Sequence, residues 1–493
     1  MNRQIRRVAI AVGILMAALL VNLNYVQVVK SDAYRNNKNN KRVILNEYAN
    51  PRGSIIVQGT PIAESVATRD ELKYLRKYPD GPVYADLTGW YSLIYDKNGL
   101  EETEDGLLSG NDSRLLGTRI TDLLTGRTPK GGSVSLTINK AAQEAAYRGL
   151  GGRRGAVVAL DPRTGAILAA ASSPSYDPSV LSSHNLDAIQ AAYKQLNSDK
   201  NQPLLPRAFQ ATYPPGSVFK VIVAAAALKA GKKPHDVIPG PTVLPLPDGG
   251  TMHNFAGESC SKNGKTTTLI DALTISCNTA FAQLGIDSGQ DALQSEANLF
   301  GMDDQGFNMP LTVSGSTMGT IENRSQLGQS SIGQFNVQMT PLQAAMISAA
   351  VENDGILMKP YLVQQELAPN LSVLDTTQPQ QQSQVLSPDQ ARQLQQMMES
   401  VVTSANGTGT NAQIANEQVG GKTGTADNSD AKGNPLPPHA WFTGYAADPV
   451  HPIAVAVVLE NAGVTGNESA GGEKAAPLAR DVMKAYLNDM SGR

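Results

Sequence analysis

The chain has 493 residues, of which 41% are hydrophobic and 17% are charged. It is too long for one ordinary domain, and its composition is that of a folded protein. The net charge of −3 gives no basic excess, so nothing in the bulk charge favours nucleic acid as a partner. The two cysteines form no CxxC pair and the five histidines follow no metal-ligand spacing, so we expect neither a metal nor another cofactor.

The N-terminus has the pattern of a membrane anchor. Arg3, Arg6 and Arg7 precede an apolar run over residues 8–21, and apolar residues continue to Val29. Counted to Val29, the segment reaches the roughly 20 residues that a membrane-spanning helix needs. A cleaved signal peptide is the alternative, but no small-x-small cleavage site follows the apolar run. We predict a retained anchor over residues 1–30, with a cytoplasmic N-terminus and an extracytoplasmic catalytic region in a single-pass membrane protein.

Residues 31–150 are polar and irregular. Charges, glycines and short apolar runs alternate there without long helical periodicity. We expect a small, strand-rich and non-catalytic module close to the membrane.

The pattern changes near residue 133. Residues 133–138 alternate like a strand, and Asn139 is a plausible N-cap for a following helix. Residues 155–161 and 166–171 form two small apolar strands around a Pro-Arg-Thr-Gly turn, which predicts a buried antiparallel hairpin. We place a catalytic domain at residues 151–493.

Helices and strands then share this large domain. Helix signals begin at Ser217, near Thr268, at Thr340-Pro341 and at Ser387-Pro388, and residues 453–459 read as a strand. The Gln-rich residues 377–384 suggest an exposed linker. The mixture predicts an α+β fold, with an antiparallel sheet flanked by helices.

The helix from Ser217 to about Leu228 carries the first chemical signal. Ser217 and Lys220 are nearly one turn apart and so share a face, and Ser217 lies at the helix N-terminus, where backbone N–H groups favour developing negative charge. The apolar residues 221–228 should desolvate Lys220, and a neutral lysine beside a hydroxyl is a general base. The alternative is a helix cap followed by a snorkelling lysine. Residues 259–262 repeat the Ser-x-x-Lys pattern in a polar stretch, which predicts a solvated loop.

Two further elements follow in order. Ser276-Cys277-Asn278 is a Ser-x-Asn triplet, a pattern that recurs elsewhere in the chain, for example at Ser109, Ser183 and Ser404, and is weak alone. Residues 422–424 form a single Lys-Thr-Gly triplet, which alone could be a turn at a strand end. The ordered set on a helix, a loop and a strand is much more specific than any member, and it points to an acyl-transferring serine enzyme.

The sequence resembles the class B penicillin-binding proteins, the monofunctional peptidoglycan transpeptidases. The resemblance extends from the anchor to about Val458 and is greatest to actinobacterial, division-associated members. Beyond the three triplets it rests on further matching segments: Pro51-Arg52-Gly53-Ser54-Ile55, Gly99-Leu100-Glu101 with Leu108, 136–138, 155–178, Gly328-Gln329, Gly333-Gln334, 340–343 and 441–445. Residues 55–59 lack the Asp-Arg-Asn that often follows the first of these, which puts the partner contacts of the N-terminal module in doubt.

The resemblance implies roles for four catalytic residues. Ser217 would attack the penultimate D-Ala carbonyl of a stem peptide, and Lys220 would take its proton. Ser276 would relay a proton to the leaving nitrogen, and Asn278 would bind the substrate amide and steady Lys220. The acyl-enzyme would then pass to the amine of a neighbouring stem.

The same resemblance implies that residues 422–425 form a substrate-binding strand. Lys422 would add positive potential, and Thr423 and Thr425 would hold the substrate carboxylate. Gly424 would let a ligand backbone approach the strand. The backbone N–H groups of Ser217 and Thr425 would form an oxyanion hole.

The implied partners are peptidoglycan stem peptides, β-lactam antibiotics, the cytoplasmic membrane, a SEDS-type glycan polymerase and division proteins, with no nucleic acid. Rival interpretations are a β-lactamase, a D,D-carboxypeptidase, and a β-lactam sensor or division scaffold with little activity. A β-lactamase rarely needs an anchor and a membrane-side module. A sensor needs more membrane spans or an output domain.

Cys260 and Cys277 are the two cysteines of a chain expected outside the cytoplasm. An oxidising location permits a disulfide between them, which would tether the loop that bears Ser276. The alternative is two small buried thiols.

Overall fold

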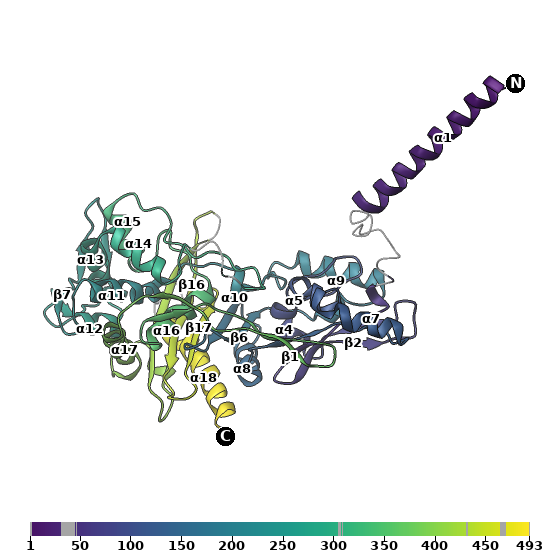
Figure 1. Cartoon of the computed structure of the whole chain (residues 1–493). Helices are drawn as coiled ribbons and strands as arrows, with labels where there is room; N and C mark the ends of the chain where they lie inside the picture. Colours follow the sequence, from purple (N-terminus) through teal and green to yellow (C-terminus); the bar gives the residue numbers. More distant parts are fainter. Residues whose placement is uncertain are drawn as a thin grey trace.

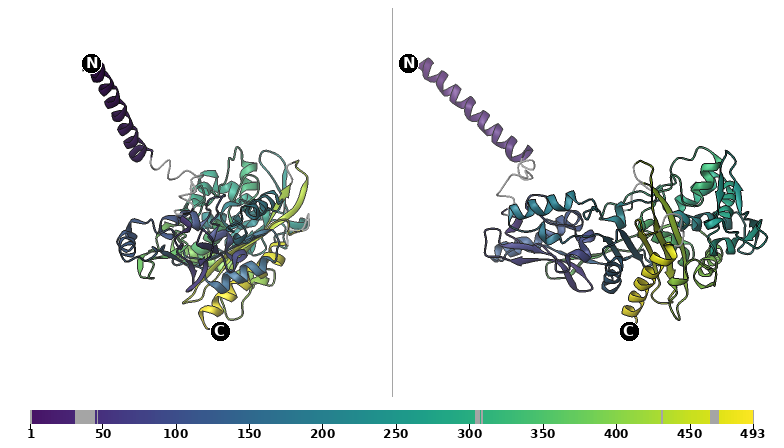
Figure 2. Two further views of the ribbon diagram at one scale, coloured as in Figure 1. Left: turned by 90° about the vertical axis from the view of Figure 1, so that its right-hand side faces the viewer. Right: turned by 180° about the vertical axis from the view of Figure 1, so that it is seen from behind.

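The computed structural model describes residues 2–30, 45, 47–303, 307, 309–429, 432–463 and 470–492. Two units lie side by side, and helix α1 (Asn2–Asn24) stands apart from both (Figures 1 and 2). Helix α1 continues into a π-helical turn over Tyr25–Val29. Together they provide one helical segment, Arg3–Val28, that is long and apolar enough to cross a membrane, and its side chains are exposed.

The N-terminal module is built on a six-stranded sheet with the strand order β13-β12-β4-β1-β2-β3. Strands β1 and β4 run parallel, and the other pairs are antiparallel. The strands are β1 (Ile55–Val57), β2 (Thr60–Ala67), β3 (Tyr74–Lys77), β4 (Ser133–Leu136), β12 (Val363–Leu367) and β13 (Val373–Thr376). Short helices accompany them: α4 (Gly81–Thr88), α5 (Leu100–Thr103), α6 (Asp105–Leu108) and α7 (Leu116–Leu124).

Two structural contacts cross the domain boundary that the sequence predicts at residue 150. Strands β12 and β13 come from the expected catalytic domain, yet β12 pairs with β4 in the module sheet. Helix α8 (Lys140–Leu150) was expected in the module, yet it packs on β6 and α18 of the catalytic unit. Long-range strand pairing places β12 and β13 in the module sheet, and packing of a helix on a sheet places α8 on the catalytic unit. Neither kind of contact leaves a local signal in the sequence.

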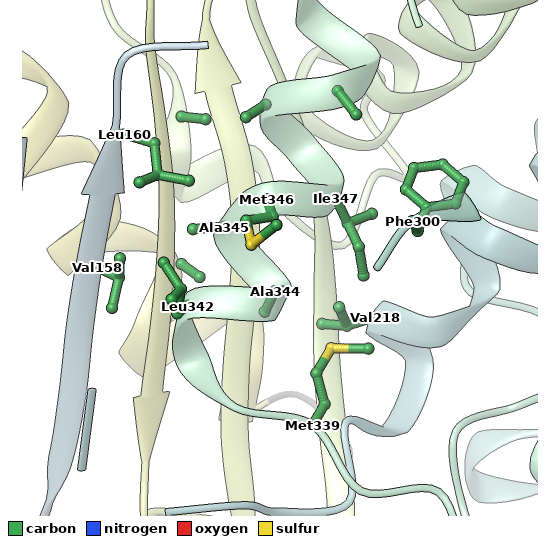
Figure 3. Packing of buried hydrophobic residues seen from close by; sticks show 14 of the residues in the cluster. Val158, Leu160, Val218, Phe300, Met339, Leu342, Ala344, Ala345, Met346 and Ile347 are labelled. Atoms are coloured by element: carbon green, nitrogen blue, oxygen red, sulfur yellow. The ribbon is translucent and has the colours of Figure 1, made fainter. Parts of the chain in front are cut away.

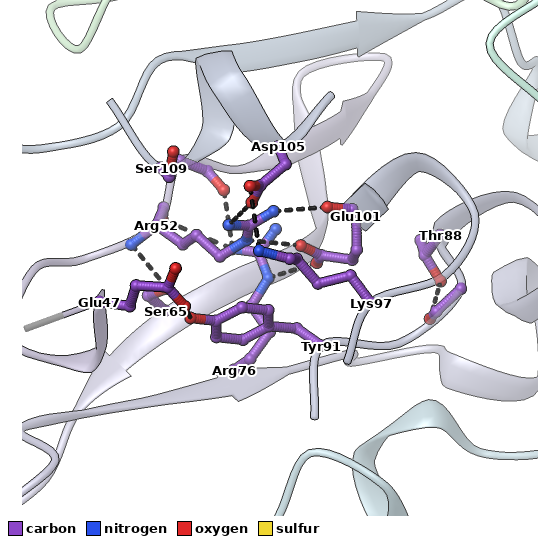
Figure 4. Close-up of polar contacts among 12 residues, drawn as sticks. Glu47, Arg52, Ser65, Arg76, Thr88, Tyr91, Lys97, Glu101, Asp105 and Ser109 are labelled. Carbon is purple, nitrogen blue, oxygen red and sulfur yellow. Dashed lines mark hydrogen bonds and ion pairs between the residues drawn. The ribbon is translucent and has the colours of Figure 1, made fainter. Parts of the chain in front are cut away.

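A buried cluster of charges joins the two N-terminal segments that carried the family resemblance. Arg52 Nε donates to Glu101 Oε2 at 2.7 Å, and Arg76 Nε donates to Glu101 Oε1 at 2.6 Å. Arg52 also pairs with Asp105, and its guanidinium lies 4.5 Å from the ring centroid of Tyr91 (Figure 4). Glu101 is fully buried, so these partners are what makes its charge tolerable inside the module.

The catalytic unit is centred on a five-stranded antiparallel sheet with the order β15-β16-β17-β5-β6. Alternate residues of β5 and β17 face two separate cores, so both faces of the sheet are buried and the strands are continuously apolar. The strands are β5 (Gly155–Leu160), β6 (Ile167–Ser173), β15 (Val419–Ser429), β16 (Pro435–Ala446) and β17 (Ile453–Leu459). The predicted hairpin and the predicted strand over 453–459 are confirmed.

Helices α8 and α18 (Ala476–Met490) cover one face of this sheet, and α16 (Pro341–Glu352) crosses the other. Thr340 caps α16 through its side chain, and Pro341 occupies the first turn, as predicted. Figure 3 shows α16 against Val158 and Leu160 of β5, with Val218 and Met339 side by side at its N-terminal end. The segment that contains Ser217 is therefore anchored to the central core.

Helices and small sheets complete the catalytic unit. Helix α17 (Pro388–Thr403) begins with a capping box at Ser387 and packs on β15. The remaining elements are α10 (Arg207–Gln210), α11 (Lys220–Lys229), α12 (Leu269–Thr274), α13 (Asn278–Ser288), α14 (Gln290–Leu299), α15 (Arg324–Ser330), β7 (Val237–Pro239), β8 (Val243–Pro245), β9 (Thr251–His253), β10 (Thr266–Thr268), β11 (Ile356–Met358) and β14 (Gln381–Gln384). Helix α9 (Leu186–Ser198) lies instead over the N-terminal module, where Tyr193 stacks on Tyr95 (Figure 1).

The Gln-rich segment is only partly the linker that was expected. Residues 381–384 form β14, which pairs antiparallel with β11. Ser383 also donates a hydrogen bond to the carbonyl of Leu299 at 2.5 Å. Backbone pairing with β11 therefore makes part of this Gln-rich segment a strand, although its polar composition predicts an exposed linker.

Candidate active site

Ser217 lies in a tight turn at the start of the helix predicted for it. The first residues, Gly216–Phe219, form a 3-10 turn, and the α-helix α11 begins at Lys220. Gly216 has φ +53°, and its N–H donates to Gly333 O at 2.9 Å. A residue with a Cβ adopts this backbone only with strain, so glycine at this position permits the tight turn that precedes Ser217.

Lys220 is fully buried and points to the Ser-x-Asn triplet. Its Nζ donates to Asn278 Oδ1 and to the Ser276 carbonyl, each at 2.7 Å, and lies 3.2 Å from Ser276 Oγ. These contacts fix the amine at one position on the first turn of α11.

Ser276 stands between α12 and α13 with φ +62°, an uncommon backbone for a non-glycine residue. Its Oγ accepts a hydrogen bond from Lys422 Nζ at 2.8 Å. One hydroxyl therefore contacts two buried lysine amines, one from each flanking motif. A hydroxyl that contacts both amines can pass a proton between groups on either side of it.

The Lys-Thr-Gly triplet lies on β15, the edge strand of the catalytic sheet. Thr423 Oγ1 is 2.7 Å from Thr408 Oγ1. A Cβ at Gly424 would stand 2.8 Å from Pro215 O, and one at Gly216 would stand 2.5 Å from Thr425 O. Gly424 thus leaves room for the turn that carries Ser217, and the expected approach of a ligand backbone stays a prediction.

A groove of about 1000 Å³ runs over this constellation. Ser217, Ser276, Thr423 and Thr425 line it. The second Ser-x-x-Lys, residues 259–262, belongs to a loop as predicted, and that loop forms part of the groove wall.

Cys260 and Cys277 form a disulfide in the structure, with a Cα–Cα distance of 5.8 Å. Cys277 is the N-cap of α13, directly between Ser276 and Asn278. The bond connects this loop of the groove wall to the Ser-x-Asn triplet.

A buried acid holds the segment that leads to Ser217. Glu460 Oε1 accepts from Arg207 Nε at 2.8 Å and from the Tyr213 hydroxyl at 2.9 Å. Arg154 reaches its other oxygen at 2.7 Å. Burial and the neighbouring Glu460 raise the pKa of Tyr213 well above its usual range, so Tyr213 remains a donor.

Several groove residues were missed by the sequence reasoning. Asn411 Nδ2 donates to Gly472 O at 3.0 Å, and Thr408 contacts Thr423. A Cβ at Gly471 would stand 2.5 Å from Gly424 O, and one at Gly472 would stand 2.2 Å from Thr408 O. The adjacent glycines 471 and 472 were an available signal, because paired glycines often mark close backbone approach.

The comparisons with known proteins agree with this geometry. Residues 155–484 match the family model of the penicillin-binding protein transpeptidase domain. The chain belongs to the penicillin-binding transpeptidases. Residues 52–134 match the model of the penicillin-binding protein A dimerisation domain.

Full-length relatives narrow the assignment within the penicillin-binding transpeptidases. The chain is 44% identical over 497 residues to the peptidoglycan D,D-transpeptidase PbpA of Mycolicibacterium smegmatis, with 100% of both chains covered. It is 43% identical to PbpA of Mycobacterium tuberculosis, with 99% of each covered. The chain is therefore a class B penicillin-binding protein and a serine-type peptidoglycan D,D-transpeptidase, as its sequence suggested.

Solved structures of penicillin-binding protein A from M. tuberculosis have the same fold. The ceftriaxone acyl-enzyme complex aligns with TM-score 0.86 at 42% identity and covers 90% of this chain and 100% of its own. The penicillin G acyl-enzyme complex aligns with TM-score 0.83 at 42% identity, covering 89% of this chain and 100% of its own.

Proposed function

We propose that Ser217 is the nucleophile of this transpeptidase and that Lys220 and Ser276 handle its proton. The groove carries this proposal, because Ser217 and Ser276 both line it and the amines of Lys220 and Lys422 both contact Ser276 Oγ. Lys422 contacts the same hydroxyl as Lys220, and a second positive charge there is unfavourable, which favours the neutral amine that a general base needs.

In the acylation step, Ser217 Oγ bonds to the penultimate D-Ala carbonyl carbon, and the bond to the terminal D-Ala nitrogen breaks. The proton of Ser217 goes to Lys220, and one proton reaches the leaving amine through Ser276. The backbone N–H groups of Ser217 and Thr425 receive the developing oxyanion. The close approach of Gly216 to the Thr425 carbonyl supports this arrangement.

The donor stem peptide binds along β15. An edge strand offers backbone groups for strand addition, and β15 lies at the sheet edge next to Ser217. Thr423 and Thr425 hold the terminal carboxylate, Lys422 adds positive potential, and Asn278 binds the substrate amide. Gly424 contributes by leaving room for the nucleophile turn.

The acyl-enzyme resolves when the amine of a second stem peptide attacks the ester carbon and releases Ser217. Water in place of the amine would give D,D-carboxypeptidase activity from the same intermediate. β-Lactams acylate the same serine, which the acyl-enzyme complexes of the M. tuberculosis relative support.

Labelling with a fluorescent penicillin tests the nucleophile. Wild type should give a covalent band, and Ser217→Ala should lose it. Ser259→Ala is the matched control, because Ser259 belongs to the other Ser-x-x-Lys on the same groove and its variant should label normally. Labelling that survives in Ser217→Ala and disappears in Ser259→Ala would reverse the assignment.

The chain is proposed to work in division at the outer face of the cytoplasmic membrane, beside a SEDS-type glycan polymerase. Helix α1 serves as a retained anchor, and Arg3, Arg6 and Arg7 keep its N-terminus inside. Protease added to intact cells should remove the catalytic unit and spare an N-terminal tag, and the opposite result would invert the topology.

A further inference from the structure

Helix α7 presents an apolar stripe that the described residues leave uncovered. Leu116, Ile120, Leu123 and Leu124 follow the i, i+4, i+7, i+8 spacing of one helix face. Their exposed fractions are 57%, 48%, 62% and 82%, and α7 has no buried residue. Four neighbouring large apolar side chains on a folded surface indicate an interaction face.

Basic residues flank this stripe. Arg119, Arg127 and Lys130 are exposed and form no ion pair within the part of the chain that the structure describes. Helix α7 has one acid, Asp122, which is half-buried and lies on the side away from the stripe. The combination of a Leu/Ile face with cationic borders is that of a helix that lies in a membrane interface.

The position of α7 brings this face within reach of the membrane. Arg119 and Pro129 line the same small cavity, of about 60 Å³, as Glu47. The chain from Lys30, at the end of the anchor helix, to Glu47 can extend about 60 Å at most. Figure 1 shows α7 at the end of the N-terminal module that lies away from the catalytic unit.

We propose that α7 is an interfacial helix that docks the N-terminal module onto the anionic surface of the membrane that holds α1. The leucine and isoleucine side chains enter the boundary between headgroups and acyl chains, and the three cations contact lipid phosphates. A symmetric contact between two copies would instead place cationic borders of like sign together, which is unfavourable. The proposal rests on the proposed anchor role of α1, and docking would fix the orientation of the groove relative to the membrane.

Lipid-borne quenching tests the contact. The full chain is placed one copy per nanodisc, in phosphatidylcholine with or without about a third phosphatidylglycerol and with a doxyl-labelled lipid. Leu123→Trp reports the stripe, and Thr118→Trp on another face of α7 is the matched control. The native Trp90 and Trp441 are 8% and 0% exposed and give a constant background. We expect at least three-fold stronger quenching of Leu123→Trp than of Thr118→Trp with the anionic lipid, and a smaller difference at high salt.

Equal quenching of the two variants, with equal access for iodide, would overturn the proposal. Shielding of Leu123→Trp only in vesicles that hold several copies would also overturn it and assign the face to a second copy. Failure of the chain to insert into the nanodisc would contradict both the anchor role of α1 and the docking of α7. Penicillin labelling of the same nanodiscs reports the active site separately, so loss of labelling with retained quenching would contradict the proposed catalytic roles alone.

Discussion

At the residue scale, Glu101 is the charge on which the N-terminal module depends most. Burial alone would raise the pKa of Glu101, but Arg76 and Arg52 outweigh it and hold the pKa below its ordinary value. The stabilising contribution is therefore fully present above the unfolded pKa of about 4.3 and is lost as the pH falls through the folded pKa.

We predict that Glu101→Gln destabilises the protein at pH 7 by about 3–5 kcal/mol, because it leaves two buried guanidinium groups without their shared carboxylate. Urea unfolding followed by circular dichroism measures this loss. Glu102→Gln, at the exposed next position, should change stability by less than about 0.5 kcal/mol. Similar losses for the two variants would mean that the buried pairs contribute little.

At the element scale, the turn before α11 depends on the small size of Gly216. A side chain there would need the left-handed backbone and would bring its Cβ to 2.5 Å from Thr425 O. Because this contact would be with a backbone oxygen, the clash could be relieved only if the turn that carries Ser217 or strand β15 moved. The strained backbone and the close contact with Thr425 O both oppose a side chain at this position.

We predict that Gly216→Ala slows acylation by penicillin at least ten-fold, since a displaced Ser217 loses alignment with Lys220. Stopped-flow or gel-based labelling rates measure the effect. Gly231→Ala, which also has positive φ but has no atom within 4 Å of the added Cβ, is the control. It should cost about 1–2 kcal/mol of stability and leave the acylation rate unchanged. An unchanged rate in Gly216→Ala would show that the turn tolerates displacement.

At the scale of the whole molecule, the two units meet where α4 packs on β6. Asp86 of α4 faces Ser172 of β6, and its Oδ2 has no hydrogen-bond partner within the described part of the chain. Burial raises the pKa of Asp86 to about 7, against the lowering effects of Ser172 and Arg207. The folded state thus holds a proton that the unfolded state releases, so stability falls as the pH rises from about 4 through about 7.

We predict that Asp86→Asn removes this slope and makes the protein more stable than wild type at pH 8 by roughly 1–3 kcal/mol. Thermal unfolding between pH 5 and pH 8 measures the difference. Asp80→Asn, at the exposed N-cap of the same helix, removes an equal charge and should keep the wild-type slope. A slope that persists in Asp86→Asn would place its origin elsewhere.

Local pattern was enough for much of this protein. The sequence by itself determined the hairpin of β5 and β6, strand β17, the capped starts of α16 and α17, and the helix after Ser217, because alternation, caps and glycines act over a few residues. It also singled out Ser217, Ser276 and Lys422, because acyl transfer constrains residue types at short spacings.

Tertiary structure alone decided what depends on distant segments. It brought β12 to β4, set Gly424 against the nucleophile turn, and brought Thr408 and Gly472 to the groove. It also left the face of α7 uncovered. Strand register and close packing join residues far apart in the sequence, and the energy of each contact depends on the whole arrangement, so no local spacing encodes them.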